Sequence, residues 1–218
     1  MFRRHVIPFI LAGVLPALAL AALVILIFRP FEVRRDRVRA PEWLKRTCLS
    51  GKVPWRNWHE IIIHHTAGEK GDLASVDRWH RQRKWRCAGY HFLIGNGTLS
   101  SGDGEIEVGP RWPTQDNGAH CSGRNDGSIG IGLVGNFDIQ TKHPGDTVPT
   151  PNRPTEAQMT SLVQLTAYLA VRYDIPIERI YVHREAALKP TVCPGKYFPI
   201  DDFRRRLRIM MNRYRADR

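Results

Sequence analysis

Cysteine is scarce in this sequence: four cysteines stand among 218 residues, and none forms a CxxC pair or has zinc-ribbon spacing. The sequence also has no internal repeat and no low-complexity tract, which excludes a solenoid and argues against a disordered chain. A hydrophobic fraction of 42% is enough for a buried core. The length then suits one domain of ordinary size with an appendage.

Acidic residues are too few to balance the basic ones, with 21 Asp and Glu against 33 Lys and Arg and a formal net charge of +12. Such an excess favours anionic partners. Neither of its two main blocks carries aromatics placed to stack bases, and no helix-turn-helix, zinc-finger or RNP pattern occurs, so we predict no nucleic-acid partner. An anionic lipid surface or polymer is favoured, and a solvated basic face without a partner is an equal alternative for the C-terminal block. The blocks are Arg29, Arg34, Arg35, Arg37 and Arg39, and Arg204, Arg205, Arg206, Arg208, Arg213 and Arg215.

Charged residues are absent between Val6 and Phe28. This segment is long enough to cross a bilayer as a helix, which needs about 20 apolar residues. A cleavable signal peptide is the alternative, since Arg3 and Arg4 precede the segment and small residues lie within it. The apolar region of such peptides spans about 7–15 residues, whereas apolarity here continues to Phe28. We therefore expect an uncleaved anchor in the lipid bilayer at residues 1–28 (spanning 6–28), a juxtamembrane linker at 29–55 and a folded domain at 56–218.

Strand-like and helix-like patterns alternate along residues 56–218. Short β-branched or glycine-containing apolar runs predict strands at residues 60–65, 90–94, 128–134 and 180–183. Helical spacing predicts helices at 72–84, 155–175 and 200–215, the second opened by a capping box that begins at Thr155. A hairpin turn is predicted at Gly95-Asn96-Gly97, and residues 100–127 are expected to be mostly loop. The alternation predicts an α/β fold with a single mixed β-sheet flanked by helices.

Two histidines at predicted strand ends and one loop cysteine form a candidate metal site: His64, His183 and Cys193. Two imidazoles and a thiolate suit Zn²⁺, which takes nitrogen and sulfur donors in tetrahedral sites. Three protein ligands leave a fourth position for water, which is typical of a catalytic site. The spacing alone leaves alternatives open, because histidines are commonly surface or core residues and a cysteine before Pro-Gly can be a small buried hydrophobe.

Five phrases around these residues follow one another along the chain: IIIHHTAG (61–68), GYHFLI (89–94), GAH (118–120), SIGIGLVGNF (128–137) and HRE through CPG (183–195). Together they strongly resemble the type 2 N-acetylmuramoyl-L-alanine amidases, the family that includes the T7 phage lysozyme and the animal peptidoglycan recognition proteins. The resemblance covers roughly residues 56–200, nearly the whole predicted domain.

This resemblance implies an enzyme that uses Zn²⁺ to hydrolyse the amide bond between N-acetylmuramic acid and L-alanine in peptidoglycan or its fragments. It implies His64, His183 and Cys193 as the metal ligands, and Tyr90 and Thr191 as catalytic residues. Tyr90 would donate to the developing oxyanion or orient the water, and Thr191 would add a second hydrogen bond. Such a substrate places the domain on the outer (periplasmic) face of the inner, cytoplasmic membrane, although the arginines that follow the apolar segment favour the opposite orientation.

Two other functions within the wider family stay open. Some animal members bind peptidoglycan without cutting it after losing a zinc ligand, and the presence of all three ligands here favours an enzyme. Cytosolic muropeptide-recycling amidases carry an aspartate ligand and a catalytic glutamate where this chain has Cys193 and Gly132, which places it nearer the phage and animal branch. The stretch between His183 and Cys193 is longer than in the animal proteins.

Neighbouring residues are expected to support this site. His65 and His91 are expected to pack beside the ligands, His120 to contact substrate in a groove, and residues 102–117 to line that groove. With one cysteine used as a ligand, the other three allow at most one disulfide if the domain is exported to an oxidising compartment. The pair that flanks the GYHFLI and GAH phrases, Cys87 with Cys121, is the favoured one, and Cys48 competes as a partner.

Overall fold

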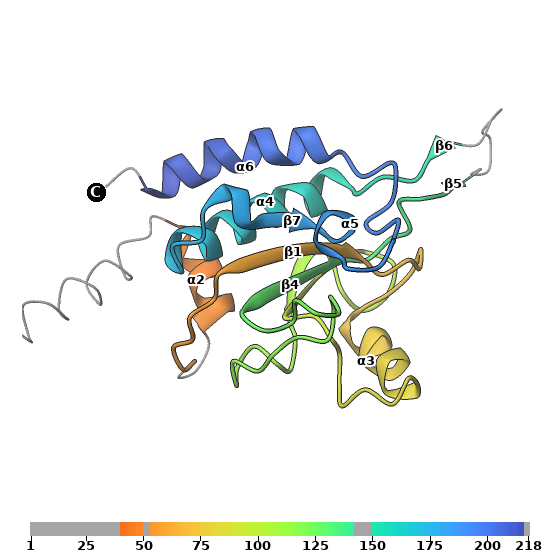
Figure 1. The fold of residues 1–218 in the computed structure, drawn as a ribbon. Coiled ribbons are helices and arrows are strands. Elements are labelled where there is room, and N and C mark those ends of the chain that lie inside the picture. Colours follow the sequence, from red (N-terminus) through yellow and green to blue (C-terminus); the bar gives the residue numbers. More distant parts are fainter. Residues whose placement is uncertain (1–39, 50–52, 142–149, 216–218) are drawn as a thin grey trace, which may run out of the picture. The chain divides into compact units, whose positions relative to one another are not determined.

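The computed structural model describes residues 40–49, 53–141 and 150–215 (Figure 1). The expected membrane anchor, residues 1–28, lies outside these residues, as does the first part of the expected linker. Among the described residues, no helix is both long and apolar enough to cross a membrane.

A five-stranded sheet forms the centre of the domain, with the strand order β3-β2-β4-β1-β7. β1 pairs in parallel with β4 and β7, β2 pairs in parallel with β4, and β3 runs antiparallel to β2 at one edge. The predicted mixed sheet is therefore confirmed. The strands are β1 (Glu60–His65), β2 (Phe92–Asn96), β3 (Asp103–Val108), β4 (Ser128–Leu133) and β7 (Ile180–Val182).

The two central strands have no exposed face. Every residue of β1 and of β4 is buried, as expected for parallel strands that are covered on both sides. This burial explains why their sequences, EIIIHH and SIGIGL, show no alternation of apolar and polar residues. It also means that the two histidines that end β1 lie inside the domain.

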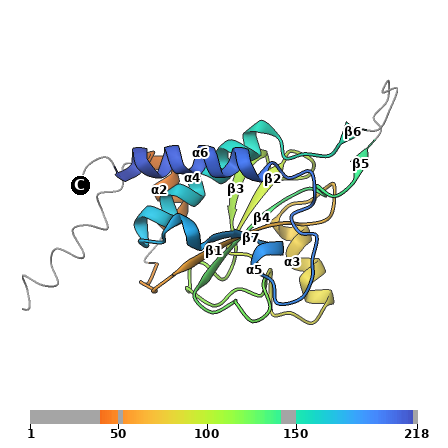
Figure 2. The ribbon, with the colours of Figure 1, turned by 45° about the horizontal axis from the view of Figure 1, so that its top comes forward.

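Helices α4 (Glu156–Arg172) and α6 (Ile200–Arg215) lie on one side of the sheet (Figure 1, Figure 2). α4 packs on β2 and β3, and α6 packs on α4. The predicted capping box is present, because Thr155 Oγ1 accepts from the Gln158 N–H at 3.0 Å and the Thr155 N–H donates to Gln158 Oε1 at 3.2 Å. The Gln158 amide also donates to the carbonyl oxygens of Ile94 and Val134. These bonds fix the start of α4 on the sheet.

Helix α3 (Leu73–Gln82) lies on the other side of the sheet (Figure 1). Its N-cap is Asp72, whose carboxylate accepts from the Ser75 N–H at 2.8 Å, while Ser75 Oγ accepts from the Asp72 N–H at 2.9 Å. Val76 then packs in a buried cluster that includes Tyr90. The helix therefore covers the side of the sheet on which Tyr90 lies.

Shorter elements complete the fold. The 3₁₀ helix η1 (Ile177–Arg179) leads into β7, and α5 (His183–Ala186) follows β7 without a gap. Strands β5 (Gln140–Thr141) and β6 (Thr150–Pro151) form a separate antiparallel pair.

Two elements differ from the sequence-based prediction. β3 lies in the stretch expected to be mostly loop, because its DGEIEV sequence carries acidic residues and glycine at the sheet edge, and such residues are depleted in strands. Helix α2 (Glu42–Leu49) lies in the expected linker, and only Leu44 and Cys48 of it are buried, too few to give a periodic signal. The Cys48 carbonyl accepts from Trp112 Nε1 at 2.7 Å. Residues 42–49 are therefore held on the folded domain.

Two expectations about surface and redox chemistry also change. All four cysteines carry free thiols, so the pairing expected for Cys87 and Cys121 is not found. Half of the C-terminal basic block is neutralised within the domain, since Arg204 pairs with Glu185, Arg205 with Asp202, and Arg206 with Glu156 and Asp202.

Candidate metal centre

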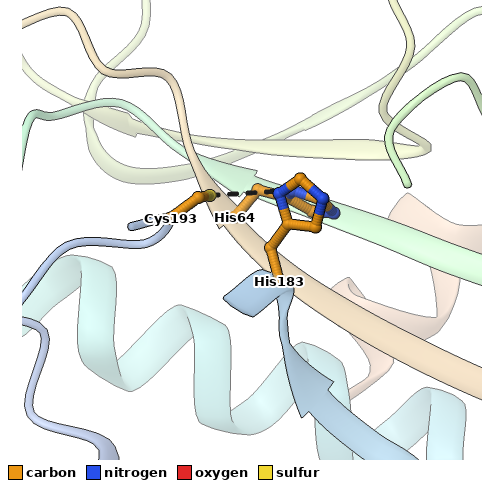
Figure 3. A group of neighbouring side chains, drawn as sticks. All are labelled: His64, His183 and Cys193. Atoms are coloured by element: carbon orange, nitrogen blue, oxygen red, sulfur yellow. Dashed lines mark hydrogen bonds between the residues drawn. The ribbon is translucent and has the colours of Figure 1, made fainter. Parts of the chain in front are cut away.

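Three segments bring the candidate ligands together where the C-terminal ends of β1 and β7 lie. His64 lies near the C-terminal end of β1, and His183 directly follows β7, which pairs in parallel with β1. Because the C-terminal ends of parallel strands meet at one edge, the two imidazoles are neighbours, with ring centroids 4.4 Å apart. Cys193 reaches them from the loop after α5. One ligand atom from each of the three side chains lies within 4.8 Å of the other two (Figure 3).

Hydrogen bonds fix the loop that carries Cys193. Its Sγ accepts from the His65 N–H at 3.4 Å, and its carbonyl oxygen accepts from the Arg184 N–H at 2.9 Å. The Arg184 guanidinium donates to the Gly195 carbonyl at 2.9 Å. Gly195 has a φ of 102°, and a Cβ there would stand 2.2 Å from the carbonyl carbon of Phe137. The glycine of the CPG phrase is therefore required by the backbone and by packing.

Burial sets the protonation of the three side chains. It lowers the pKa of His64 far below the ordinary range, with a further contribution from nearby histidines, and it lowers the pKa of His183. Both imidazoles are therefore neutral at pH 7, and each offers a nitrogen lone pair. Burial raises the pKa of the Cys193 thiol to about 12. That thiol ionises near pH 7 only beside a strong cation, such as a metal ion.

The donor set and its spacing fit zinc. A tetrahedral site with Zn–N bonds of about 2.0 Å and Zn–S bonds of about 2.3 Å separates its nitrogen and sulfur donors by about 3.5 Å. Cys193 Sγ lies 3.8 Å from His64 Nδ1, close to that separation. Calcium and magnesium take oxygen ligands, and these three side chains offer none. A cluster of three protein donors also keeps one coordination position for water.

Tyr90 lies beside His64, with ring centroids 5.3 Å apart. Its hydroxyl donates to the His65 carbonyl at 3.3 Å. Gly132, which pairs with His64 in the register of β1 and β4, leaves room for the tyrosine ring, because a Cβ there would stand 2.9 Å from Tyr90 Cδ2. Burial raises the pKa of Tyr90, so the hydroxyl keeps its proton at neutral pH and is available as a donor.

Thr191 lies two residues before Cys193 in the same loop. Its Oγ1 accepts from the Cys193 N–H at 3.3 Å. Since the oxygen is the acceptor in that bond, the hydroxyl proton is available to another acceptor. The structure thus places both sequence-predicted catalytic residues, Tyr90 and Thr191, around the three candidate ligands.

Two pockets open at this site. One, of about 370 Å³, lies beside Tyr90 and is also lined by Lys70 and Trp79. The other, of about 480 Å³, lies beside His183 and Thr191. Residues 102–117, expected to line a groove, contribute to neither pocket, because part of that stretch forms the edge strand β3. Residues 119–122 and 125 line the second pocket instead.

His65 and His91 have the packing roles that their position in the phrases suggested. His65 Nδ1 accepts from the Phe137 N–H at 3.2 Å. His91 Nδ1 accepts from the Gly130 N–H at 2.9 Å, and its Nε2 lies 2.9 Å from the Asp116 carbonyl oxygen. Both rings therefore connect backbone segments around the site.

His120 lines the pocket beside His183 and also makes a contact that the sequence did not predict. Expected as a substrate contact, it is only 8% exposed, and its Nδ1 lies 3.0 Å from His64 Nε2. It contributes to the wall of the pocket beside His183, yet its closest polar contact is with a candidate ligand. The two histidines stand 56 residues apart in sequence, so only the fold reveals their contact.

Comparison with known proteins finds relatives across the region that carries the site. The profile of the N-acetylmuramoyl-L-alanine amidase family matches residues 54–196. The endolysin of Escherichia phage T7 is 32% identical over 139 residues, which cover 62% of this chain and 79% of the endolysin. Peptidoglycan-recognition protein SC2 of Drosophila melanogaster is 32% identical over 165 residues, which cover 71% of this chain and 77% of that protein.

Solved structures show the same similarity. The endolysin N-acetylmuramoyl-L-alanine amidase LysCS from Clostridium intestinale superposes with a TM-score of 0.56 at 31% identity, over 70% of this chain and 84% of that chain. Drosophila peptidoglycan recognition protein SD superposes with a TM-score of 0.52 at 20% identity, over 76% of this chain and 87% of that chain. The second likeness shows the fold alone.

Proposed function

The chain belongs to the type 2 N-acetylmuramoyl-L-alanine amidase family, and from that membership we propose that it is a zinc-dependent amidase of peptidoglycan. The bond hydrolysed is the amide between N-acetylmuramic acid and the L-alanine of the stem peptide. The observation that carries the proposal is the convergence of His64, His183 and Cys193, whose ligand atoms lie within 4.8 Å of one another. These three side chains would hold the zinc ion.

When bound, zinc would lower the pKa of a water molecule to near 7, and zinc itself would polarise the scissile carbonyl. The protein's own residues then stabilise the charge that develops on the carbonyl oxygen. Tyr90 lies beside His64, and its protonated hydroxyl donates to the His65 carbonyl. Thr191 carries a hydroxyl proton that its bond to the Cys193 N–H leaves available. Two such hydroxyls, if they donate to the oxygen on which negative charge develops, would stabilise the transition state of hydrolysis more than the bound substrate, and so would lower the activation barrier.

The two pockets suit a substrate that extends in both directions from the scissile bond. Each pocket has one exposed tryptophan, Trp79 at 42% and Trp85 at 36%, whose ring faces can stack on the apolar faces of sugars. Each also has one lysine, Lys70 in one pocket and Lys189 in the other, suited to carboxylates of the stem peptide. Peptidoglycan offers both kinds of group around the bond in question.

A peptidoglycan-binding module without activity is the competing function, because some relatives are named only for recognition. Such a module needs the two pockets but not the metal donors. A buried imidazole and a buried thiol lie beside a half-buried imidazole, with ligand atoms within 4.8 Å of one another; a metal ion explains this arrangement, and wall binding alone does not require it. The enzyme is therefore the function that the site supports best.

We propose further that residues 6–28 anchor the protein in the inner membrane with the domain on its outer, periplasmic face, where intact peptidoglycan lies. A reporter that is active only after export, fused after Arg218, is expected to be active. An inactive reporter would mean that the domain stays in the cytoplasm, and would support a muropeptide-recycling amidase instead.

The central test is hydrolysis by the full-length protein, purified in detergent. The protein is incubated with wall sacculi alone, with a zinc chelator, and with the chelator followed by excess zinc. We expect new L-alanine amino termini in the first and third reactions and none in the second. Binding to sacculi without new amino termini in any reaction would support the non-catalytic module.

A further inference from the structure

The two ring nitrogens of His64 face different partners. Nδ1 lies 3.8 Å from Cys193 Sγ and so points into the ligand cluster. Nε2 lies 3.0 Å from His120 Nδ1, on the opposite side of the ring. The ring planes of the two histidines are nearly perpendicular, at 78°, with centroids 5.0 Å apart. His64 Nε2 and His120 Nδ1 are therefore close enough to share one hydrogen bond.

One arrangement of protons satisfies these contacts. A metal at His64 Nδ1 needs the lone pair of that nitrogen, so the single proton of a neutral His64 is on Nε2. His120 Nδ1 must then accept that proton's hydrogen bond, which places the proton of His120 on its own Nε2. That nitrogen lies 3.4 Å from the Ser128 carbonyl oxygen, which accepts it. The opposite tautomer of His120 would set two N–H groups against each other.

The fold leaves the His120 ring little freedom to turn. A Cβ at Gly130 would stand 2.4 Å from His120 Cδ2, and a Cβ at Gly118 would stand 2.2 Å from the same atom. The His120 N–H donates to Asn125 Oδ1 at 2.8 Å, which fixes the backbone from which the ring projects. Glycines in the GAH and SIGI phrases thus make a close-fitting space for this imidazole.

We propose that His120 is a positioning residue for the metal centre. By accepting the Nε2–H of His64, it fixes the tautomer and the ring orientation in which His64 Nδ1 binds zinc. The inference rests on the proposed function for the presence of zinc, and it assigns His120 no contact with the reacting bond. Loss of such an outer hydrogen-bond partner typically weakens metal binding by about 10–100-fold.

Paired substitutions separate this role from general packing. His120→Leu removes the acceptor, whereas His120→Asn keeps an oxygen near the position of Nδ1. His91→Leu is the matched control, because His91 is fully buried, its ring lies 5.8 Å from that of His120, and its hydrogen bonds go to backbone groups of Gly130 and Asp116. The zinc dissociation constant of each full-length variant is measured by competition with a chelator of known affinity. The absorption spectrum of the Co²⁺-loaded protein reports the geometry of the site.

We expect zinc binding about 10–100-fold weaker in His120→Leu, with an altered Co²⁺ spectrum, and binding within a few-fold of the parent in His120→Asn. His91→Leu should melt at a lower temperature and bind zinc as tightly as the parent. The proposal is overturned if His120→Leu binds zinc within twofold of the parent, or if all three variants weaken binding equally.

A measurement on the unsubstituted protein covers the case in which a variant does not fold. In the zinc-loaded protein, histidine side-chain ¹⁵N–¹H spectra should show the proton of His64 on Nε2 and that of His120 on Nε2, and a proton on His64 Nδ1 would contradict the proposal. None of these readouts uses substrate. A parent protein that binds zinc but hydrolyses no peptidoglycan would therefore refute the amidase function and not the role of His120.

Discussion

Replacing Tyr90 by phenylalanine removes one oxygen from the site and keeps the ring. The ring is 8% exposed and packs with Val76 and Leu93, and these contacts survive the change. Among the described residues the hydroxyl makes one hydrogen bond, to the His65 carbonyl at 3.3 Å, which is long for an O–H donor. We therefore expect a stability loss of about 0.5–1.5 kcal/mol at most.

The expected loss of activity is larger. Removing one hydrogen-bond donor to an oxyanion typically lowers kcat by about 10²–10³, which corresponds to about 2.7–4 kcal/mol. Zinc content should stay at the parent level, because the Tyr90 hydroxyl is not one of the three donor atoms. A large effect on turnover with a small effect on stability and none on zinc is the signature of a catalytic donor.

The assay measures kcat and KM on a soluble muropeptide, zinc content and melting temperature for the same preparations. A change of 1 kcal/mol shifts the melting temperature of a domain of this size by about 2–4 °C. Tyr168→Phe is the control, since Tyr168 is a buried tyrosine of α4, 1% exposed, and lines neither pocket. A Tyr90→Phe enzyme with parental kcat and full zinc content would refute the role of the hydroxyl.

Three further predictions follow from contacts described above. Cys193→Ser should lose zinc and hydrolysis together while still binding sacculi, because a weak neutral hydroxyl replaces a thiolate; metal analysis and a sacculus pull-down measure both. Gly132→Ala should keep zinc yet lower turnover, since the new Cβ would stand 2.9 Å from the Tyr90 ring and displace it; kinetics with zinc analysis tests this. Asp72→Ala should cost about 1 kcal/mol at pH 7 through loss of the N-cap of α3. Hydrogen bonds from Ser100 and Ser75 lower the pKa of Asp72 from 3.8 to about 2. The ionised carboxylate therefore stabilises the fold above about pH 4, and this contribution is lost as the pH falls toward 2. Denaturant titrations should show that the stabilities of the parent and the Asp72→Ala variant converge at that low pH.

The first two of these predictions have matched controls. Cys48→Ser changes another buried cysteine, on α2, and should retain zinc; a Cys193→Ser enzyme that hydrolyses at the parental rate would remove the ligand assignment. Gly102→Ala is the control for Gly132→Ala, because Gly102 lines neither pocket and a Cβ there would meet only the flexible Glu105 side chain, at 3.3 Å; equal kinetics in both variants would contradict the steric argument. For Asp72, a stability difference that stays constant from pH 7 to pH 2 would show that the charge plays no part.

The sequence predicted the elements whose patterns come from burial. β1 was expected at residues 60–65 and α6 at 200–215, and both are found there, because a fully buried strand and a one-sided helix leave clear apolar patterns. β3 and α2 were missed for the opposite reason. Each buries little, and each is held by contacts with residues distant in sequence, such as the bond from Trp112 to the Cys48 carbonyl.

The site could be predicted only in part for a similar reason. His64, His183 and Cys193 were selected by the phrases that surround them, and parallel pairing of β1 with β7 explains why the two histidines meet. No local pattern indicates that His120 stands behind His64, since that contact depends on how the loop before β4 passes the end of β1. Likewise, no local pattern indicates that the Tyr90 ring lies against Gly132, since that contact depends on how the strands are arranged.

A metal ion bound by the three candidate ligands would also connect parts of the chain that no disulfide crosslinks. Cys193 lies 129 residues after His64, and all four thiols are unpaired. An ion bound only by the folded arrangement stabilises it by mass action, by about 2.7 kcal/mol when free zinc is a hundredfold above the dissociation constant. Typical domains have a total stability of only about 5–15 kcal/mol. Loss of the proposed zinc ion is therefore expected to shorten the survival of the protein under proteolysis, in addition to stopping the proposed hydrolysis.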